Sequence, residues 1–159
     1  MVTATAVATA TATATAETTI PAAAVSARGP GRVNLIGEHT DYNGGLALPF
    51  AIDRGVTATA EPLDGDRFEI VAEDLRETDA FPLSGPERAE GWRGFARGVV
   101  GELAAAGVEL VPARVRFTGD VPRGSGLSSS AALETALCLA LLGVAGAEDR
   151  KSTRLNSSH

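Results

Sequence analysis

Apolar and polar positions alternate with two different periods along the middle of the chain. Residues 67–72 and 113–118 alternate with a period of two, which predicts two half-buried strands. Between them, apolar side chains recur at helical spacing over residues 92–106, and Gly107 is placed to end that helix. We interpret this stripe, which includes Trp92 and Phe95, as core rather than as a cofactor contact. Prolines and a glycine within residues 82–86 predict a loop before the helix.

The flanking segments complete a mixed order of strands and helices. Residues 32–36 form a short strand candidate, and residues 46–60 carry the β-branched and apolar side chains of one or two strands. Asn43-Gly44-Gly45 between them is a strong hairpin-turn signal. Residues 131–142 are apolar on nearly every side, which predicts a buried helix with Cys138 as a small core residue. This order predicts an α+β domain.

The two ends of the chain differ in composition from the rest. Residues 2–16 are almost entirely alternating Thr and Ala, and residues 1–24 have no basic start and no long apolar run, so we expect a disordered leader or an over-extended start site rather than a secretion signal. Residues 149–159 contain the only lysine and match a translation of a common sequencing-adapter oligonucleotide, so we treat them as foreign. The remaining residues, 25–148, form the predicted domain.

Composition and charge narrow the possible partners. The 159 residues are 44% apolar, which suits one globular domain. A net charge of −6 argues against nucleic acids and anionic membranes as partners. The longest apolar stretch, residues 136–147, is too short to cross a bilayer. A single cysteine excludes a disulfide within the chain and fits a reducing cytoplasm.

A first polar motif lies between the short strand and the hairpin signal. Within ten residues it gathers a guanidinium, two carboxylates, an imidazole and a hydroxyl, namely Arg32, Glu38, His39, Thr40 and Asp41. A sugar hydroxyl is both a donor and an acceptor, so carboxylates and cationic donors together suit a polyhydroxylated ligand. Taken singly, the two acidic residues could be ordinary surface turn residues and the arginine a solvated strand residue.

A second motif runs from Pro122 to Ala132, directly before and into the predicted buried helix. Its central residues are Gly124, Ser125, Gly126, Leu127, Ser128, Ser129 and Ser130. The glycines permit positive φ, and the helix start presents unpaired N–H groups, so an anion could bind there. The Walker pattern is absent because no lysine lies in or near the loop. The alternative is a strand-to-helix turn with a serine as N-cap.

Both motifs together resemble one enzyme family. Residues 31–42 closely resemble the galactokinase signature, and residues 122–132 resemble the second motif of the GHMP kinases. The resemblance extends over residues 27–148. It implies a mixed sheet packed against helices with a left-handed βαβ crossover, an exception to the usual hand. It also implies transfer of the γ-phosphoryl group of MgATP to O1 of α-D-galactose, with ATP, Mg²⁺ and galactose as the small-molecule partners.

The resemblance also implies roles for individual residues. Glu38, His39, Thr40 and Asp41 would bind sugar hydroxyls, and Arg32 would stabilise charge near the anomeric oxygen. The second motif would surround the ATP phosphates, with the Ser130 hydroxyl on Mg²⁺. In galactokinases the catalytic aspartate and a metal-binding glutamate come from motifs later than residue 148, so we expect these 159 residues alone to be inactive.

Two other functions stay open from the sequence. A related anomeric sugar kinase would act on N-acetylgalactosamine or arabinose instead of galactose, and the residues that decide between these sugars are not identifiable here. A non-catalytic galactose sensor would use the same fold. Known sensor relatives have lost residues beside the serine run, whereas Ser130-Ala131 is intact.

Overall fold

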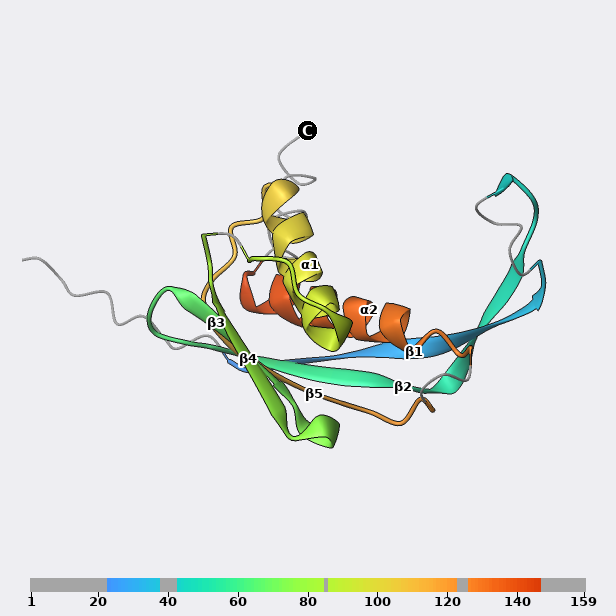
Figure 1. The fold of residues 1–159 in the computed structure, drawn as a ribbon, viewed down its shortest axis with the longest axis horizontal. Helices are drawn as coiled ribbons and strands as arrows, with labels where there is room; N and C mark the ends of the chain where they lie inside the picture. Colours follow the sequence, from blue (N-terminus) through green and yellow to red (C-terminus); the bar gives the residue numbers. More distant parts are fainter. Residues whose placement is uncertain (1–22, 38–42, 85, 123–125, 147–159) are drawn as a thin grey trace, which may run out of the picture.

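A computed structural model describes residues 23–37, 43–84, 86–122 and 126–146. They form one mixed five-stranded sheet with two helices on one of its faces (Figure 1). The strand order is β1-β2-β5-β3-β4. The pair β3–β5 is parallel and the other pairs are antiparallel, so the predicted α+β class is confirmed. Most of the predicted leader, and the whole predicted adapter-encoded tail, lie outside the described residues.

The elements follow one another from a long two-stranded ribbon to a helix that is buried on one face. Their bounds are β1 Val25–Ile36, β2 Leu48–Pro62, β3 Arg67–Ala72, a short 3₁₀ turn η2 Glu73–Leu75, β4 Glu77–Pro82, α1 Gly91–Ala105, β5 Ala113–Gly119 and α2 Ser129–Val144. Beyond the helices, the β1–β2 ribbon extends away from the rest of the sheet (Figure 1).

The core lies between the helices and the sheet face that they cover. Alternate residues of the central strands point into it, among them Ala58, Ile70 and Val115, all at most 1% exposed. Helix α2 contributes Ala136 and Leu137 to the same cluster, and α1 contributes fewer buried residues. The opposite sheet face carries cross-strand ion pairs between arginines of β5 and glutamates of β2 and β3. A sheet covered on one face only explains why period-two alternation was so clear in the sequence.

Several predicted elements are confirmed. Strand β3 has the predicted bounds, and β5 extends the predicted strand by one residue. Helix α1 spans the predicted apolar stripe except for its last residue, the C-cap Ala106, and Gly107 follows at φ +81°. The N–H of Gly107 bonds to the carbonyl of Ala104, and that of Val108 bonds to the carbonyl of Leu103. These bonds satisfy carbonyls that the helix end would otherwise leave unpaired.

Strand β4 is absent from the predictions, and Pro82, expected in a loop, is its last residue. Its core-facing pattern is hidden because Asp79, a polar residue, occupies a buried position at 9% exposure. The guanidinium of Arg97 donates two 2.8 Å hydrogen bonds to its two carboxylate oxygens. Proline is tolerated because β4 is an edge strand.

Strand β1 starts seven residues before the prediction, at Val25 rather than Arg32. Glycines and Pro30 obscure its first part, but these small residues suit its position against α2. Gly29 is buried, and a Cβ there would collide with the carbonyl of Ala132. The predicted hairpin is present, although pairing stops at Ile36–Leu48, so its connection is much longer than a two-residue turn.

Helix α2 is longer than predicted by two residues at each end, and its burial is one-sided. The face toward the sheet is buried, whereas Glu134 and Thr135 are exposed and Leu139 is 42% exposed. The expectation of a helix buried on nearly every side is therefore wrong for its outer face, which α1 covers only in part. Cys138 is half-buried and free. None of the described helices is long and apolar enough to cross a bilayer.

Candidate functional site

The two sequence motifs meet at the start of α2. The backbone N–H of Arg32, in β1, donates a 3.1 Å hydrogen bond to the carbonyl of Leu127. Next to it, Gly31 is buried, and a Cβ at that position would lie 3.1 Å from the same carbonyl oxygen. The strand that leads to the acidic motif is therefore in direct contact with the serine-rich loop. Nearly a hundred residues separate the two segments in the sequence.

The predicted sugar-binding residues are described only in part. Arg32 lies on β1 opposite Ala51 with an exposed side chain, which leaves its guanidinium accessible to a ligand. Glu38, His39, Thr40 and Asp41 lie outside the described residues. The sugar site remains a prediction from the sequence.

The predicted phosphate loop ends in a strained approach to α2. Gly126 has φ +73° and Ser128, the N-cap residue, has φ +57°. The Ser128 side chain makes no capping hydrogen bond. The first N–H groups of the helix therefore receive no capping bond from Ser128, and their partial positive charge suits an anion. This geometry does not favour the alternative in which the serines serve only as a helix cap. Gly124 and Ser125 lie outside the described residues.

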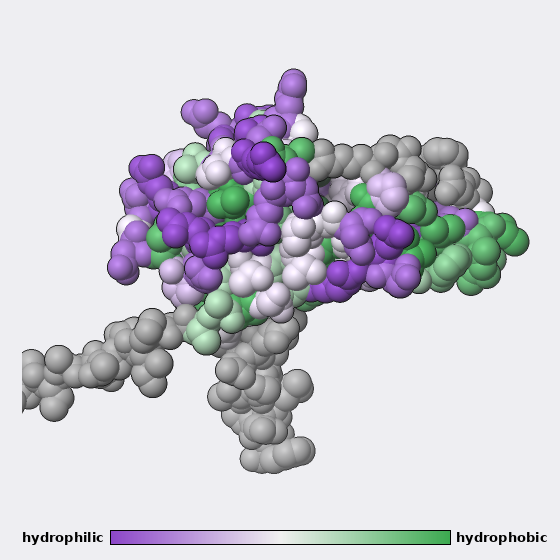
Figure 2. Space-filling view, turned by 90° about the horizontal axis from the view of Figure 1, so that it is seen from below, coloured by the Kyte–Doolittle hydropathy of each residue, from purple (hydrophilic) through white to green (hydrophobic). Residues whose placement is uncertain are grey.

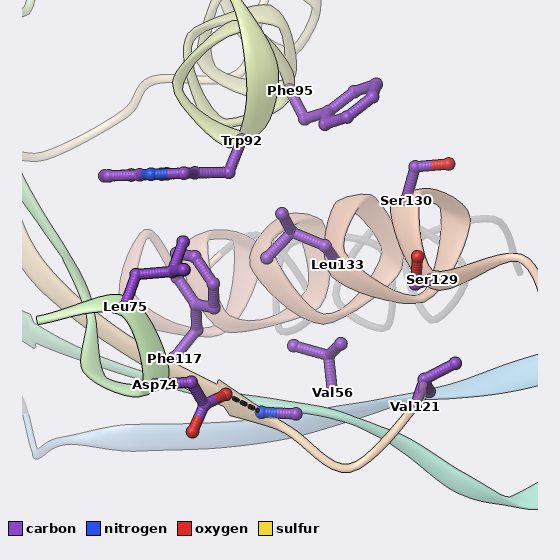
Figure 3. Close-up of a pocket in the computed structure, with 11 residues that line it drawn as sticks. Val56, Asp74, Leu75, Trp92, Phe95, Phe117, Val121, Ser129, Ser130 and Leu133 are labelled. Carbon is purple, nitrogen blue, oxygen red and sulfur yellow. Dashed lines mark hydrogen bonds between the residues drawn. The ribbon is translucent and has the colours of Figure 1, made fainter. Parts of the chain in front are cut away.

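A cavity of about 330 Å³ opens beside this helix start (Figure 3). Trp92 and Phe95 of α1 form one side, and Ser129 and Ser130 lie at one end. Trp92 packs edge-on against Phe117 of β5, with ring centroids 5.5 Å apart. Its indole N–H donates a 2.8 Å hydrogen bond to Glu77. The cavity therefore has aromatic side chains along one side and two serine hydroxyls at one end. The remaining lining residues are Val56, Asp74, Leu75, Gly119, Val121 and Leu133.

One acidic residue of this cavity supports its backbone. Asp74 accepts 2.7 Å hydrogen bonds from the Thr118 hydroxyl and from the N–H of Gly119, and so fixes the end of β5. The dashed line in Figure 3 marks the second of these bonds. Sequence reasoning missed Asp74 and Phe117 as lining residues and assigned Trp92 to the core. Trp92 does pack against the core cluster, but it also faces the cavity.

Within the described part of the chain, the acidic, histidine and cysteine side chains form no group of three that could hold a metal ion. Ser130, the predicted Mg²⁺ ligand, is exposed at the start of α2. A single hydroxyl suits a Mg²⁺ ion that takes its other ligands from nucleotide phosphates and water. It does not suit an ion held by the protein alone.

Comparison with known proteins identifies both motifs. Residues 17–62 match the galactokinase galactose-binding signature, and residues 94–156 match the GHMP kinases N terminal domain. A crystal structure of Lactococcus lactis galactokinase complexed with galactose superposes with a TM-score of 0.66 at 30% identity. The match covers 80% of this chain and 38% of that one. A mevalonate kinase from Methanococcus jannaschii gives the same TM-score at 21% identity, over 76% of this chain and 40% of its own, and shows the shared fold.

The described fold and the matched motifs place this chain in the GHMP kinase superfamily. Within that superfamily, it belongs to the galactokinase family. Galactokinase from Roseiflexus sp. (strain RS-1) is 49% identical over 114 residues, and that from Thermosipho africanus is 42% identical over 117. These matches cover 71% and 74% of this chain. They cover only 29% and 32% of the relatives, so the chain spans about a third of their length.

Proposed function

We propose that this chain supplies the sugar-binding and phosphate-binding part of a galactokinase. The reaction is transfer of the γ-phosphoryl group of MgATP to O1 of α-D-galactose, giving galactose 1-phosphate and ADP. The observation that carries the proposal is the hydrogen bond between Arg32 and Leu127, because it brings the two family motifs side by side. Adjacent sugar and phosphate sites are what phosphoryl transfer needs, since its catalysis depends mainly on alignment and charge stabilisation.

Each part of the described site has a place in this proposal. The aromatic side of the cavity suits the flat, apolar faces of a nucleotide base, and its serine end leads to the uncapped helix start, which suits phosphate oxygens. Ser130 would contact a Mg²⁺ ion that arrives with ATP. The guanidinium of Arg32 would stabilise negative charge at the sugar oxygen.

The remaining functions of the site fall on residues outside the described part. Glu38, His39, Thr40 and Asp41 would hold the sugar hydroxyls. The catalytic carboxylate would come from the part of the relatives that this chain does not match, so we expect no turnover by the 159 residues alone. We also propose that β3 and β5, the parallel pair, are joined by the left-handed crossover of the family, and that the protein works in a reducing cytoplasm.

A binding experiment and a chimera test the proposal together. Calorimetric titration of the purified chain should detect MgATP and galactose, and a coupled ADP-release assay should detect no turnover. Replacing the matched segment of the Roseiflexus enzyme with residues 25–146 of this chain should give galactose-dependent turnover, which Arg32→Met should abolish. Turnover by the 159 residues alone would contradict the expected inactivity. A folded chimera that binds both ligands without turnover would favour a sensor, and a preference for arabinose or N-acetylgalactosamine would reassign the substrate.

A further inference from the structure

Asp120, the first residue after β5, is bonded twice to one glycine of β2. Its carboxylate accepts a 2.6 Å hydrogen bond from the N–H of Gly55. Its own N–H donates a 3.0 Å bond to the carbonyl of Gly55. Both backbone polar groups of Gly55 are therefore paired with Asp120. A side chain at Gly55 would collide with the carbonyl of Gly29, so this close packing requires glycine there.

Two arginines, one on β2 and one on β1, also contact Asp120. The guanidinium of Arg54 donates a 3.2 Å hydrogen bond to the Asp120 carbonyl. Arg28 of β1 lies 3.6 Å from the carboxylate and donates a 2.7 Å bond to the carbonyl of Asp53. The Gly55 N–H, followed by the charges of these arginines, lowers the pKa of Asp120 below its usual value. The carboxylate is thus ionised and bonded at neutral pH.

Asp120 and Leu127 lie on either side of residues 123–125, which are outside the described part, and both are attached to the β1–β2 ribbon. Asp120 bonds to Gly55, which is paired with Pro30 of β1. Leu127 accepts the N–H of Arg32. The two attachments flank a register shift between Pro30 and Arg32, where the ladder is irregular. Such shifts bend the strand, so the orientation of the ribbon depends on what holds them.

We propose that Asp120 is a positioning residue for the phosphate site. By fixing the start of the connection to Gly55, it sets where Leu127 and the following serines lie relative to the strand that carries Arg32. This inference rests on the proposed function, because the serines matter only if they bind phosphate. Asp120 itself contacts no reacting group and acts through the backbone that it holds.

Two variants and one control separate positioning from general stability. Asp120→Ala removes the acceptor for Gly55, whereas Asp120→Asn keeps an acceptor oxygen and loses only the charge. Glu69→Ala is the control: it removes a carboxylate that Arg114 binds at 2.7 Å on the opposite sheet face, away from the loop. Amide hydrogen exchange without ligand reports the Arg32 N–H, and titrations with MgATP and with adenosine report binding.

If Asp120 positions Leu127 and the serines that follow, the variants should differ in a specific way. In Asp120→Ala the Arg32 amide should exchange about tenfold faster, although the mutated side chain does not bond to it. MgATP should bind about tenfold more weakly, because displaced serines would contact the phosphates less well, and adenosine should bind within about twofold of wild type. Asp120→Asn and Glu69→Ala should stay within about threefold of wild type in each measurement.

Three results would overturn the inference. The first is an unchanged Arg32 amide in Asp120→Ala, and the second is an equal loss of MgATP and adenosine affinity. The third is the same faster exchange in Glu69→Ala, which would indicate general destabilisation. If the wild-type chain binds no MgATP, the proposed function fails. The ligand-free exchange of Arg32 then decides alone whether Asp120 positions the loop.

Discussion

The N–H of Arg32 and the carbonyl of Leu127 are joined by a 3.1 Å hydrogen bond, which connects the strand β1 to the start of the helix α2. The contact is possible because β1 carries glycines where it passes the helix. Gly29 lies against the Ala132 carbonyl, and Gly31 lies against Leu127 itself. At Gly29 the backbone of β1 approaches the backbone of α2 directly. The geometry of this approach should therefore be sensitive to the smallest possible addition, a methyl group.

The first prediction is that Gly29→Ala destabilises the chain by about 1–3 kcal/mol, the range found for overpacked cores. The new Cβ would collide with the Ala132 carbonyl, so α2 would have to move away from β1. Gly98→Ala is the matched control, because nothing lies within 4 Å of the added Cβ there. It removes a glycine from the interior of α1 and should stabilise by up to about 1 kcal/mol. Urea unfolding followed by circular dichroism measures both, and equal stability of Gly29→Ala and wild type would contradict the argument.

The second prediction concerns acid and the buried pair Asp79–Arg97. The Arg97 guanidinium, by its hydrogen bonds and then its charge, lowers the pKa of Asp79 despite the opposing effect of burial. The unfolded chain has the ordinary aspartate value of about 3.9, so the pair stabilises the fold fully above that pH. This stability is lost as the pH falls through the lower folded-state pKa. Urea titrations from about pH 6 to about pH 3, a range that includes the ordinary aspartate pKa of about 3.9, measure this loss. The free energy of unfolding should fall less in Asp79→Asn than in wild type.

At neutral pH, Asp79→Asn should lower the free energy of unfolding by about 3 kcal/mol, because it leaves the half-buried Arg97 charge without its partner carboxylate. Glu61→Gln is the control. It breaks an ion pair with Arg116 whose side chains are 42% and 43% exposed. Exposed pairs contribute little, so its cost should stay below about 1 kcal/mol. Similar costs for the two variants would show that burial does not distinguish these pairs.

The sequence predicted best where burial follows a simple period. Strand β3 and helix α1 each present one apolar face, so their patterns could be recognised without knowing their partners. Strand β4 could not, because Asp79 becomes compatible with the core only through Arg97, eighteen residues later. The first part of β1 was hidden for a related reason: Gly29 is required by the approach of α2, and a strand pattern gives no sign of it.

The candidate site likewise contains some residues that the sequence could predict and others that it could not. Each family motif is contiguous, so Arg32 and the serine run could be found from the sequence alone. The cavity could not, because Asp74, Trp92, Phe117 and Ser130 come from four different elements. The positive φ of Ser128 was also unpredictable, since serine seldom adopts it.

The third prediction uses Trp92, the only tryptophan in the chain, as a reporter. If a nucleotide base occupies the cavity, MgATP should change the intensity or wavelength of Trp92 emission, because the ring forms part of the cavity wall. Galactose should leave the emission unchanged. Trp92→Phe should keep the edge-on packing on Phe117 and abolish the signal while calorimetry still detects binding. Calorimetric binding of MgATP to wild type with no change in emission would place the base elsewhere.

The fourth prediction concerns the exposed apolar end of the β1–β2 ribbon. Leu46 is 94% exposed and Ile36 is 73% exposed, with Leu35, Leu48 and Phe50 beside them at 64%, 58% and 44%. Figure 2 shows this apolar surface gathered at one end of the molecule. Contiguous exposed apolar surface promotes association, so the chain should self-associate with increasing concentration.

Two variants locate the surface responsible. Ile36 and Leu48 are cross-strand partners, and replacing both by Thr places a β-branched side chain, which suits a strand, at each position while removing apolar area. Sedimentation velocity should then show a smaller associated fraction at equal concentration. Leu139→Gln is the comparison, because Leu139 is the large apolar residue exposed on the outer face of α2. If Leu139→Gln reduces association and the ribbon variant does not, the outer face of α2 is the surface through which the chain associates, and the prediction for the ribbon is wrong.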